Sequence, residues 1–143
     1  LDTMDNNPSC INHVSLGTND FKSAASFYDK VLATLGVKRI MEHPGAIAYG
    51  KEFPEFWLNT PVNTERAMVG NGTHVGFMAA NKNEVDMFHA AALQAGATDE
   101  GAPGPRAEYG EAYYGGFVRD LDGHKIEASY IDMEIIRRDY GVA

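Results

Sequence analysis

Two histidines and a glutamate carry the side chains that a divalent metal ion takes as ligands. His13 and His74 lie in the β-like stretches CINHVSLGT and THVGFMAA, and neutral imidazole commonly binds Zn, Fe or Ni and tolerates Mn. Glu127 lies among apolar residues in HKIEASYI, where an unpaired buried carboxylate would be costly and a cation would remove that cost. We therefore expect one divalent ion (Zn, Ni, Fe or Mn) bound by His13, His74 and Glu127. The alternative for each histidine is an ordinary hydrogen-bonded core residue.

The two halves of the chain repeat the surroundings of these histidines. Aligning His13 with His74 also aligns Phe27 with Phe88. A polar cap, Asn19-Asp20 in the first half and an asparagine at 81 or 83 in the second, precedes an amphipathic helical pattern that ends at a glycine. The repeat predicts two modules that place His13 and His74 at equivalent points, facing one another.

Short β-like runs follow each helical pattern. They are VKRIMEH, AIAYG and EFWLN in the first half, and ATDEG, AYYGGFVRD and HKIEASYI in the second, where Asp122-Gly123 marks a hairpin. We expect an α+β domain in which two tandem βαβββ modules form a curved mixed sheet around a central cleft. The expected boundaries are module 1 at about 9–60, a linker at 61–70, module 2 at about 71–132 and a tail at 133–143.

The position equivalent to Glu127 in the first module should supply a fourth ligand. An ungapped alignment puts Trp57 there, and Glu55 has the same strand parity two residues earlier. A bulge or a shorter turn would bring Glu55 into the site as a catalytic carboxylate beside Glu127. Without such a shift, Trp57 lines the cleft as an apolar wall and the site has three protein ligands.

Further side chains are candidates for substrate contact. Tyr113 and Tyr114 alternate sides of their strand, so one of them should face the cleft. Arg119 and Arg106 could pair with an anionic substrate group or form surface salt bridges. The segment 102–111, rich in Gly and Pro, could cover the pocket or serve as a linker. The expected substrate contacts are Trp57, Phe56, Tyr113, Tyr114 and Arg119, and the other histidines, His43, His89 and His124, are expected at the surface or its boundary.

Composition restricts the partners. The net charge of −8 argues against nucleic acid, which requires a basic face, and leaves neutral or cationic small molecules. The sequence has no apolar run long enough to span a bilayer, so no membrane partner is expected. Cys10 is the only cysteine, so no internal disulfide is possible and a cytoplasmic setting is the default expectation.

The sequence resembles the vicinal oxygen chelate superfamily, which includes glyoxalase I, bleomycin- and fosfomycin-resistance proteins and extradiol dioxygenases. The resemblance lies in INHVSLGTNDFKSAASFYDKVL, GTHVGF and FVRDLDGHKIEA, and it extends over residues 9 to 132. It implies metal ligands at His13, His74, Glu127 and a fourth-strand position between Glu55 and Trp57. Relatives often form dimers, and the resemblance implies a homodimer whose sites lie within one chain or are shared between two.

Two functions of different classes follow from this resemblance. The first is a metal-dependent lyase or isomerase of glyoxalase type that acts through an enediolate on a small molecule with vicinal oxygens, with Glu127 or Glu55 as the base. The second is a non-catalytic antibiotic-binding protein of bleomycin-resistance type. An extradiol dioxygenase is less favoured, because those enzymes carry a tyrosine where this chain has Phe117.

Overall fold

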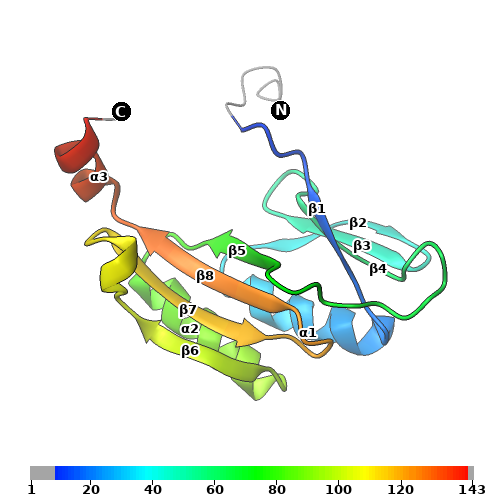
Figure 1. The fold of residues 1–143 in the computed structure, drawn as a ribbon. Helices are drawn as coiled ribbons and strands as arrows, with labels where there is room; N and C mark the ends of the chain where they lie inside the picture. The colour runs from blue at the N-terminus through cyan, green and yellow to red at the C-terminus, as the bar shows by residue number, and fades with distance from the viewer. Residues whose placement is uncertain (1–8, 142–143) are drawn as a thin grey trace.

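The strands of each half form a separate four-stranded sheet. The computed structural model describes residues 9–141 (Figure 1). The first half contains β1 (Val14–Gly17), α1 (Phe21–Ala33), β2 (Lys38–His43), β3 (Ala46–Gly50) and β4 (Phe56–Asn59). The second contains β5 (His74–Met78), α2 (Lys82–Gln94), β6 (Thr98–Gly104), the short 3-10 helix η2 (Ala107–Tyr109), β7 (Tyr113–Arg119) and β8 (Lys125–Ile131), and α3 (Met133–Tyr140) follows.

The two sheets have the same topology. Their strand orders are β1-β4-β3-β2 and β5-β8-β7-β6, and in each the first strand runs parallel to the fourth. The expected pair of tandem βαβββ modules is therefore confirmed. In the part of the chain that the structure describes, β1 and β5 each pair with one strand and lie at sheet edges, so the two sheets do not join into one curved sheet.

Local signals fix where the two long helices begin. The Asp20 carboxylate accepts a hydrogen bond from the Ser23 amide at 3.1 Å at the start of α1. At the start of α2, the Asn81 side chain accepts from the Glu84 amide at 2.8 Å, and the Glu84 carboxylate accepts from the Ala80 amide at 2.8 Å. These bonds satisfy amide groups that a helix leaves without partners in its first turn.

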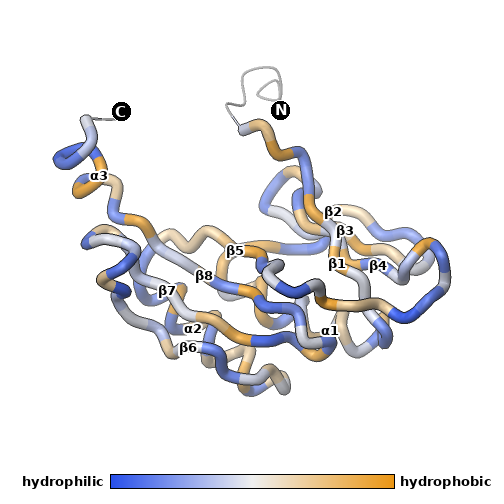
Figure 2. Tube along the Cα trace, in the orientation of Figure 1, coloured by the Kyte–Doolittle hydropathy of each residue, from blue (hydrophilic) through white to orange (hydrophobic). Residues whose placement is uncertain are grey.

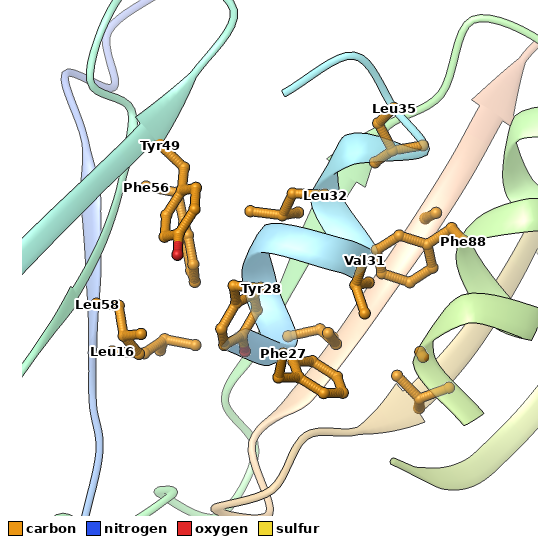
Figure 3. Close-up of a cluster of buried hydrophobic side chains, with 14 of the residues drawn as sticks. Leu16, Phe27, Tyr28, Val31, Leu32, Leu35, Tyr49, Phe56, Leu58 and Phe88 are labelled. Carbon is orange, nitrogen blue, oxygen red and sulfur yellow. The ribbon is translucent and has the colours of Figure 1, made fainter. Parts of the chain in front are cut away.

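The core lies on both sides of α1. Figure 3 shows the apolar side chains of α1 between Tyr49, Phe56 and Leu58 of the first sheet and Phe88 of α2. The rings of Phe56 and Tyr28 have centroids 5.0 Å apart, and Phe56 also contacts Phe77 of β5 at 5.0 Å. One apolar core thus joins the two modules and holds β1 and β5 in a fixed relation.

A buried polar network also joins the modules. Tyr28 of α1 donates a short hydrogen bond to the Asp120 carboxylate, whose other oxygen accepts the backbone amides of Asp122 and His124 at 2.9 Å each. His124 in turn donates from Nε2 to the carbonyl of Gly17 at 2.7 Å. Burial raises the pKa of Asp120 above its usual value, against the lowering effect of its hydrogen bonds. The Asp-Gly turn before β8 therefore also ties the second module to the end of β1.

Two of the three histidines expected at the surface or its boundary are buried. His124 is 4% exposed and His89 7% exposed, and His89 lies 3.0 Å from an oxygen of Asp99. A partner for the imidazole removes most of the cost of burial, and such long-range partners are invisible to local sequence pattern.

The tail contains a helix that the sequence reading missed. The Asp132 side chain caps α3 by accepting from the amide of Glu134 at 3.0 Å. The helix projects from the end of β8 (Figure 1), and hydrophobic and hydrophilic residues alternate along it (Figure 2). Within residues 9–141, no helix is long and apolar enough to cross a membrane.

Candidate functional site

A histidine, a glutamate and a tyrosine meet on the face of the second sheet that points away from α2. Nε2 of His74 lies 3.0 Å from Oε1 of Glu127, and the Tyr113 hydroxyl donates to Oε2 of Glu127 at 2.5 Å. The residue Glu127 is 8% exposed, whereas the His74 side chain is 45% exposed. Burial, and then the bond to Glu127, raises the pKa of Tyr113 well above its usual range, so its hydroxyl remains a donor.

Strand register and two glycines position this group. Gly76 of β5 pairs with Glu127 of β8, and a Cβ at Gly76 would lie 3.3 Å from Oε1 of that carboxylate. At Gly115 a Cβ would lie 2.1 Å from the Tyr113 hydroxyl. The Tyr113 ring therefore lies over Gly115 to reach Glu127, and small residues flank the carboxylate on two strands.

The segment after β6 covers the neighbouring part of this face. The Tyr109 ring contacts Tyr113 with centroids 4.9 Å apart, and the Arg106 guanidinium lies 5.9 Å from the centroid of Phe117. Phe117 pairs with Glu127 across the sheet and lies 6.2 Å from His74, ring to ring. The residues after β6 thus pack beside the group, whereas residues 102–104 of the segment that was expected to cover the pocket or serve as a linker belong to β6.

His13 lies apart from these residues, on the first module. It is exposed just before β1, its Nδ1 is 2.6 Å from Oδ1 of Asn12, and its ring lies edge-on to Trp57 with centroids 6.4 Å apart. The exposed His43 also contacts Trp57, with the two rings stacked and their centroids 6.1 Å apart. The face of β4 that carries Trp57 is therefore aromatic.

The described His and carboxylate side chains of one chain are too few to form a complete site for a divalent ion. Such sites use at least three protein ligands. Residues 9–141 contain no group of three or more His, Cys, Asp and Glu side chains arranged to hold a metal ion. One chain brings together two of the expected ligands, His74 and Glu127, and by itself does not fit the ion.

Glu55 borders a cavity between the edges of β1 and β5. This cavity of about 340 Å³ has mostly apolar walls and includes Gly76, the residue opposite Glu127. Glu55 is exposed at the entry to β4, and its backbone carbonyl accepts the amide of Val14. Glu55 and Gly76 therefore line one cavity, whereas Trp57 occupies the position equivalent to Glu127.

The other expected substrate contacts have varied surroundings. Phe56 is 3% exposed and packs in the core. Tyr114 faces α2, where its hydroxyl donates to Asp86 at 2.7 Å. Arg119 forms a salt bridge of 2.5 Å with Glu100. Of the two adjacent tyrosines, Tyr113 is the one beside Glu127.

Sequence reasoning missed the contacts that fix Glu127. The bond from Tyr113 joins residues on neighbouring strands, and the contact of Lys125 with Phe117, whose ring centroid lies 5.0 Å from Nζ, was not predicted. Strand parity was the available signal, because Lys125 and Glu127 share a face of β8.

Two βαβββ modules with an imidazole and a carboxylate on paired strands of the second module define a protein of glyoxalase-like fold. The family model described as Glyoxalase/Bleomycin resistance protein/Dioxygenase superfamily matches residues 10–128, and the chain belongs to this superfamily. Among curated proteins, none matches the sequence significantly.

Solved structures share the fold. A glyoxalase/bleomycin resistance protein from Albidiferax ferrireducens T118 is 36% identical, with a TM-score of 0.76 over 85% of this chain and 98% of that one. A glyoxalase/bleomycin resistance protein/dioxygenase family enzyme from Burkholderia phytofirmans PsJN is 19% identical, with a TM-score of 0.66 over 86% and 99%. Lactoylglutathione lyase from Agrobacterium tumefaciens is 22% identical, with a TM-score of 0.59 over 85% and 93%.

Proposed function

We propose that the protein is a metal-dependent lyase or isomerase of glyoxalase type, acting on a small molecule with vicinal oxygens. The observation that carries the proposal is the pairing of His74 with the buried carboxylate of Glu127 at 3.0 Å. Burial of a carboxylate without partners would be costly. Here an imidazole and a phenol fix a carboxylate that is only 8% exposed, and this arrangement supports a chemical role for Glu127.

We further propose that the working unit is a homodimer in which His13 of one chain completes the site of another. Support comes from the equivalent strand positions of the two histidines and from the separation of His13 from the His74–Glu127 pair within one chain. A twofold dimer repeats each contact, so one such arrangement would build two sites.

A divalent ion, when bound, would polarise a substrate carbonyl as a Lewis acid. The residues of the chain would do the rest. His74 and Glu127 would hold the ion. We assign the proton transfer to Glu127 rather than Glu55, because Trp57, and not Glu55, occupies the position of the first module that is equivalent to Glu127. Tyr113 would orient the Glu127 carboxylate, and Trp57 of the first module would line the substrate cleft.

Metal analysis of protein purified without chelator tests the proposal. We expect about one equivalent of Zn, Ni, Fe or Mn per chain, lost in His13→Ala and in His74→Ala and kept in the control His43→Ala, which removes an exposed histidine that stacks on Trp57. Formation of lactoylglutathione is the first activity to assay, because the Agrobacterium relative bears that name. Absence of metal in the wild-type protein, together with ligand binding that proceeds without turnover, would instead favour a binder of bleomycin-resistance type.

Mixing inactive variants tests whether chains share a site. If His13 and His74 belong to different chains, a mixed dimer of His13→Ala and His74→Ala has one intact site, and equal mixing restores about a quarter of the wild-type sites. If each site lies in one chain, mixing restores none.

A further inference from the structure

The cavity between the edges of β1 and β5 is separate from the group formed by His74, Glu127 and Tyr113. It measures about 340 Å³, and residues of both modules line it. Of the residues that the structure describes, none of those three lines this cavity. Its apolar walls include Val14, Leu35, Val37, Phe56, Val75 and Phe77. The cavity is therefore a second place in the molecule that is shaped for a small ligand.

Packing fixes the walls of this cavity before any ligand arrives. Leu35 is 1% exposed and Phe56 3% exposed, and both belong to the apolar core that joins the modules. The rings of Phe56 and Phe77 lie with their centroids 5.0 Å apart. Pockets for small molecules are largely preformed, mostly apolar and upward of about 300 Å³ in volume. A stable protein interface buries about 800 Å² on each partner, which is more than the walls of such a cavity offer.

The free edge of β5 brings backbone hydrogen-bonding groups to the cavity. Within residues 9–141, β5 pairs with β8 alone, in parallel register. The Ala79 amide donates to the Ser129 carbonyl at 2.9 Å. Since alternate residues of a strand direct their N–H and C=O groups to opposite edges, those of Gly76 and Met78 point away from β8. Gly76 and Met78 both line the cavity, so its wall contains donors and acceptors spaced as in a sheet.

The charges at the rim of the cavity cancel. Lys51 and Glu55 are exposed and are the two charged residues among the described residues that line it. Neither forms a salt bridge with another described residue. Apolar walls and a rim without net charge favour an uncharged occupant, because a charged group would lose hydration without a matching opposite charge.

We propose that this cavity binds a small, uncharged molecule of peptide type, in which one apolar side chain is flanked by two amide groups. Its N–H donates to the carbonyl of Gly76 and its C=O accepts from the amide of Met78, as an added strand does at a sheet edge. A dry cavity of about 150 Å³ holds benzene, so this cavity has room for the side chain and the backbone of one residue. The ligand contacts both modules, and binding should therefore also stabilise their packing.

Titration with N-acetyl-leucine amide tests this site. The probe is added to wild-type protein with labelled Val and Leu methyl groups, and the methyl resonances are followed by NMR. We expect saturable shifts at Val14, Val37 and Val75. The ester analogue, in which oxygen replaces the leucine N–H, keeps the shape of the probe and loses the bond to Gly76. It should bind about two- to tenfold more weakly, which corresponds to the net contribution of one hydrogen bond.

A matched pair of variants locates the binding. Val14→Phe places a larger side chain in the wall and should abolish the shifts at Val37 and Val75. Val62→Phe makes the same change at a valine that is 100% exposed and should bind the probe like the wild-type protein. If the spectrum of Val14→Phe shows misfolding, Val37→Phe fills the same cavity from another wall.

Several outcomes would overturn the site. These are the absence of shifts in the wild-type protein, equal binding of the amide and its ester analogue, and undiminished binding by a folded cavity-filling variant. Binding that weakens as the protein concentration rises would show that a second copy of the chain occupies the edge of β5, and it would overturn the site as well. Because the titration needs neither metal nor turnover, its result and that of the metal assay are independent.

Discussion

Trp57 and Glu127 occupy the same position in the two modules. Ser15, two residues after His13, pairs with Trp57, and Gly76, two residues after His74, pairs with Glu127. The first module therefore has an indole, stacked on His43, where the second has a carboxylate. This difference between equivalent strands makes the two halves of the proposed site chemically unequal.

Placing a carboxylate at this position should strengthen metal binding. If two chains share the site, Trp57→Glu adds a fourth ligand, and metal affinity should rise at least about tenfold, because ligand number and charge set affinity. Calorimetric titration with the metal found in the purified protein measures the change. Trp57→Gln is the control, because glutamine matches glutamate in size but has no charge. Equal metal affinities for the Trp57→Glu and Trp57→Gln variants would argue against a shared site.

Loss of the Tyr113 hydroxyl should weaken the site without unfolding the protein. Within residues 9–141, Tyr113 and His74 are the only side chains bonded to Glu127, and Tyr113→Phe leaves Oε2 of Glu127 without its donor. Partners that orient a ligating carboxylate contribute about 10- to 100-fold to metal affinity or activity. Tyr114→Phe removes a similar phenol–carboxylate bond on the opposite face and should leave both quantities unchanged.

A methyl group at Gly115 should weaken the site in the same way as the loss of the Tyr113 hydroxyl, by displacing the Tyr113 ring. The added Cβ would lie 2.1 Å from the Tyr113 hydroxyl, so the ring must move and its bond to Glu127 must break. Gly115→Ala should therefore lower metal affinity or activity as much as Tyr113→Phe does, and the double variant should be no worse than either single one. Additive losses would mean that Gly115 acts by another route.

Local sequence signals predicted most of the fold. Asp20 and Asn81, each one of two candidates, cap the helices, and the repeat around His13 and His74 predicted the βαβββ order of both modules. The prediction stopped short at α3, where residues 133–143 were interpreted as a tail; the helix has 8 residues and buries no side chain, so no core position marked it.

The site was less predictable, because its contacts join distant parts of the chain. Strand parity placed Glu127 and one of the two adjacent tyrosines on a common face, yet which tyrosine, and that it would bind Glu127, depended on the β7–β8 register. The burial of His124 depended likewise on a carbonyl of β1. The separation of His13 from the His74–Glu127 pair depended on how the two modules pack against each other, which the pattern within a strand does not encode.

Alkaline pH should destabilise the fold through three tyrosines. Burial, with a neighbouring carboxylate, raises the pKa of Tyr28, Tyr49 and Tyr113 above the usual value, which the unfolded chain retains at about 10. The folded state then holds protons that the unfolded state releases, so the free energy of unfolding falls as pH rises above about 10. Urea unfolding at pH 8, 10 and 11 measures this slope. Tyr49→Phe should reduce the slope, and an unchanged slope in that variant would contradict the assignment.

The contact between Tyr28 and Asp120 should contribute to stability as a coupled pair. Tyr28→Phe leaves an oxygen of a buried carboxylate without its donor, and Asp120→Ala removes the acceptor of the Tyr28 hydroxyl and of two backbone amides. Each loss should lower the free energy of unfolding by about 1–3 kcal/mol, and each kcal/mol should lower the melting temperature by about 2–4 °C. The double variant should lower the free energy of unfolding by less than the sum of the two single variants, by about 0.5–3 kcal/mol, because both changes remove one network.

Tyr109→Phe, which alters a ring that is 58% exposed, is the control and should change the free energy of unfolding by less than about 0.5 kcal/mol. If the losses at Tyr28 and Asp120 simply add, the two groups act independently, and the tie between the modules depends instead on the bond from His124 to Gly17.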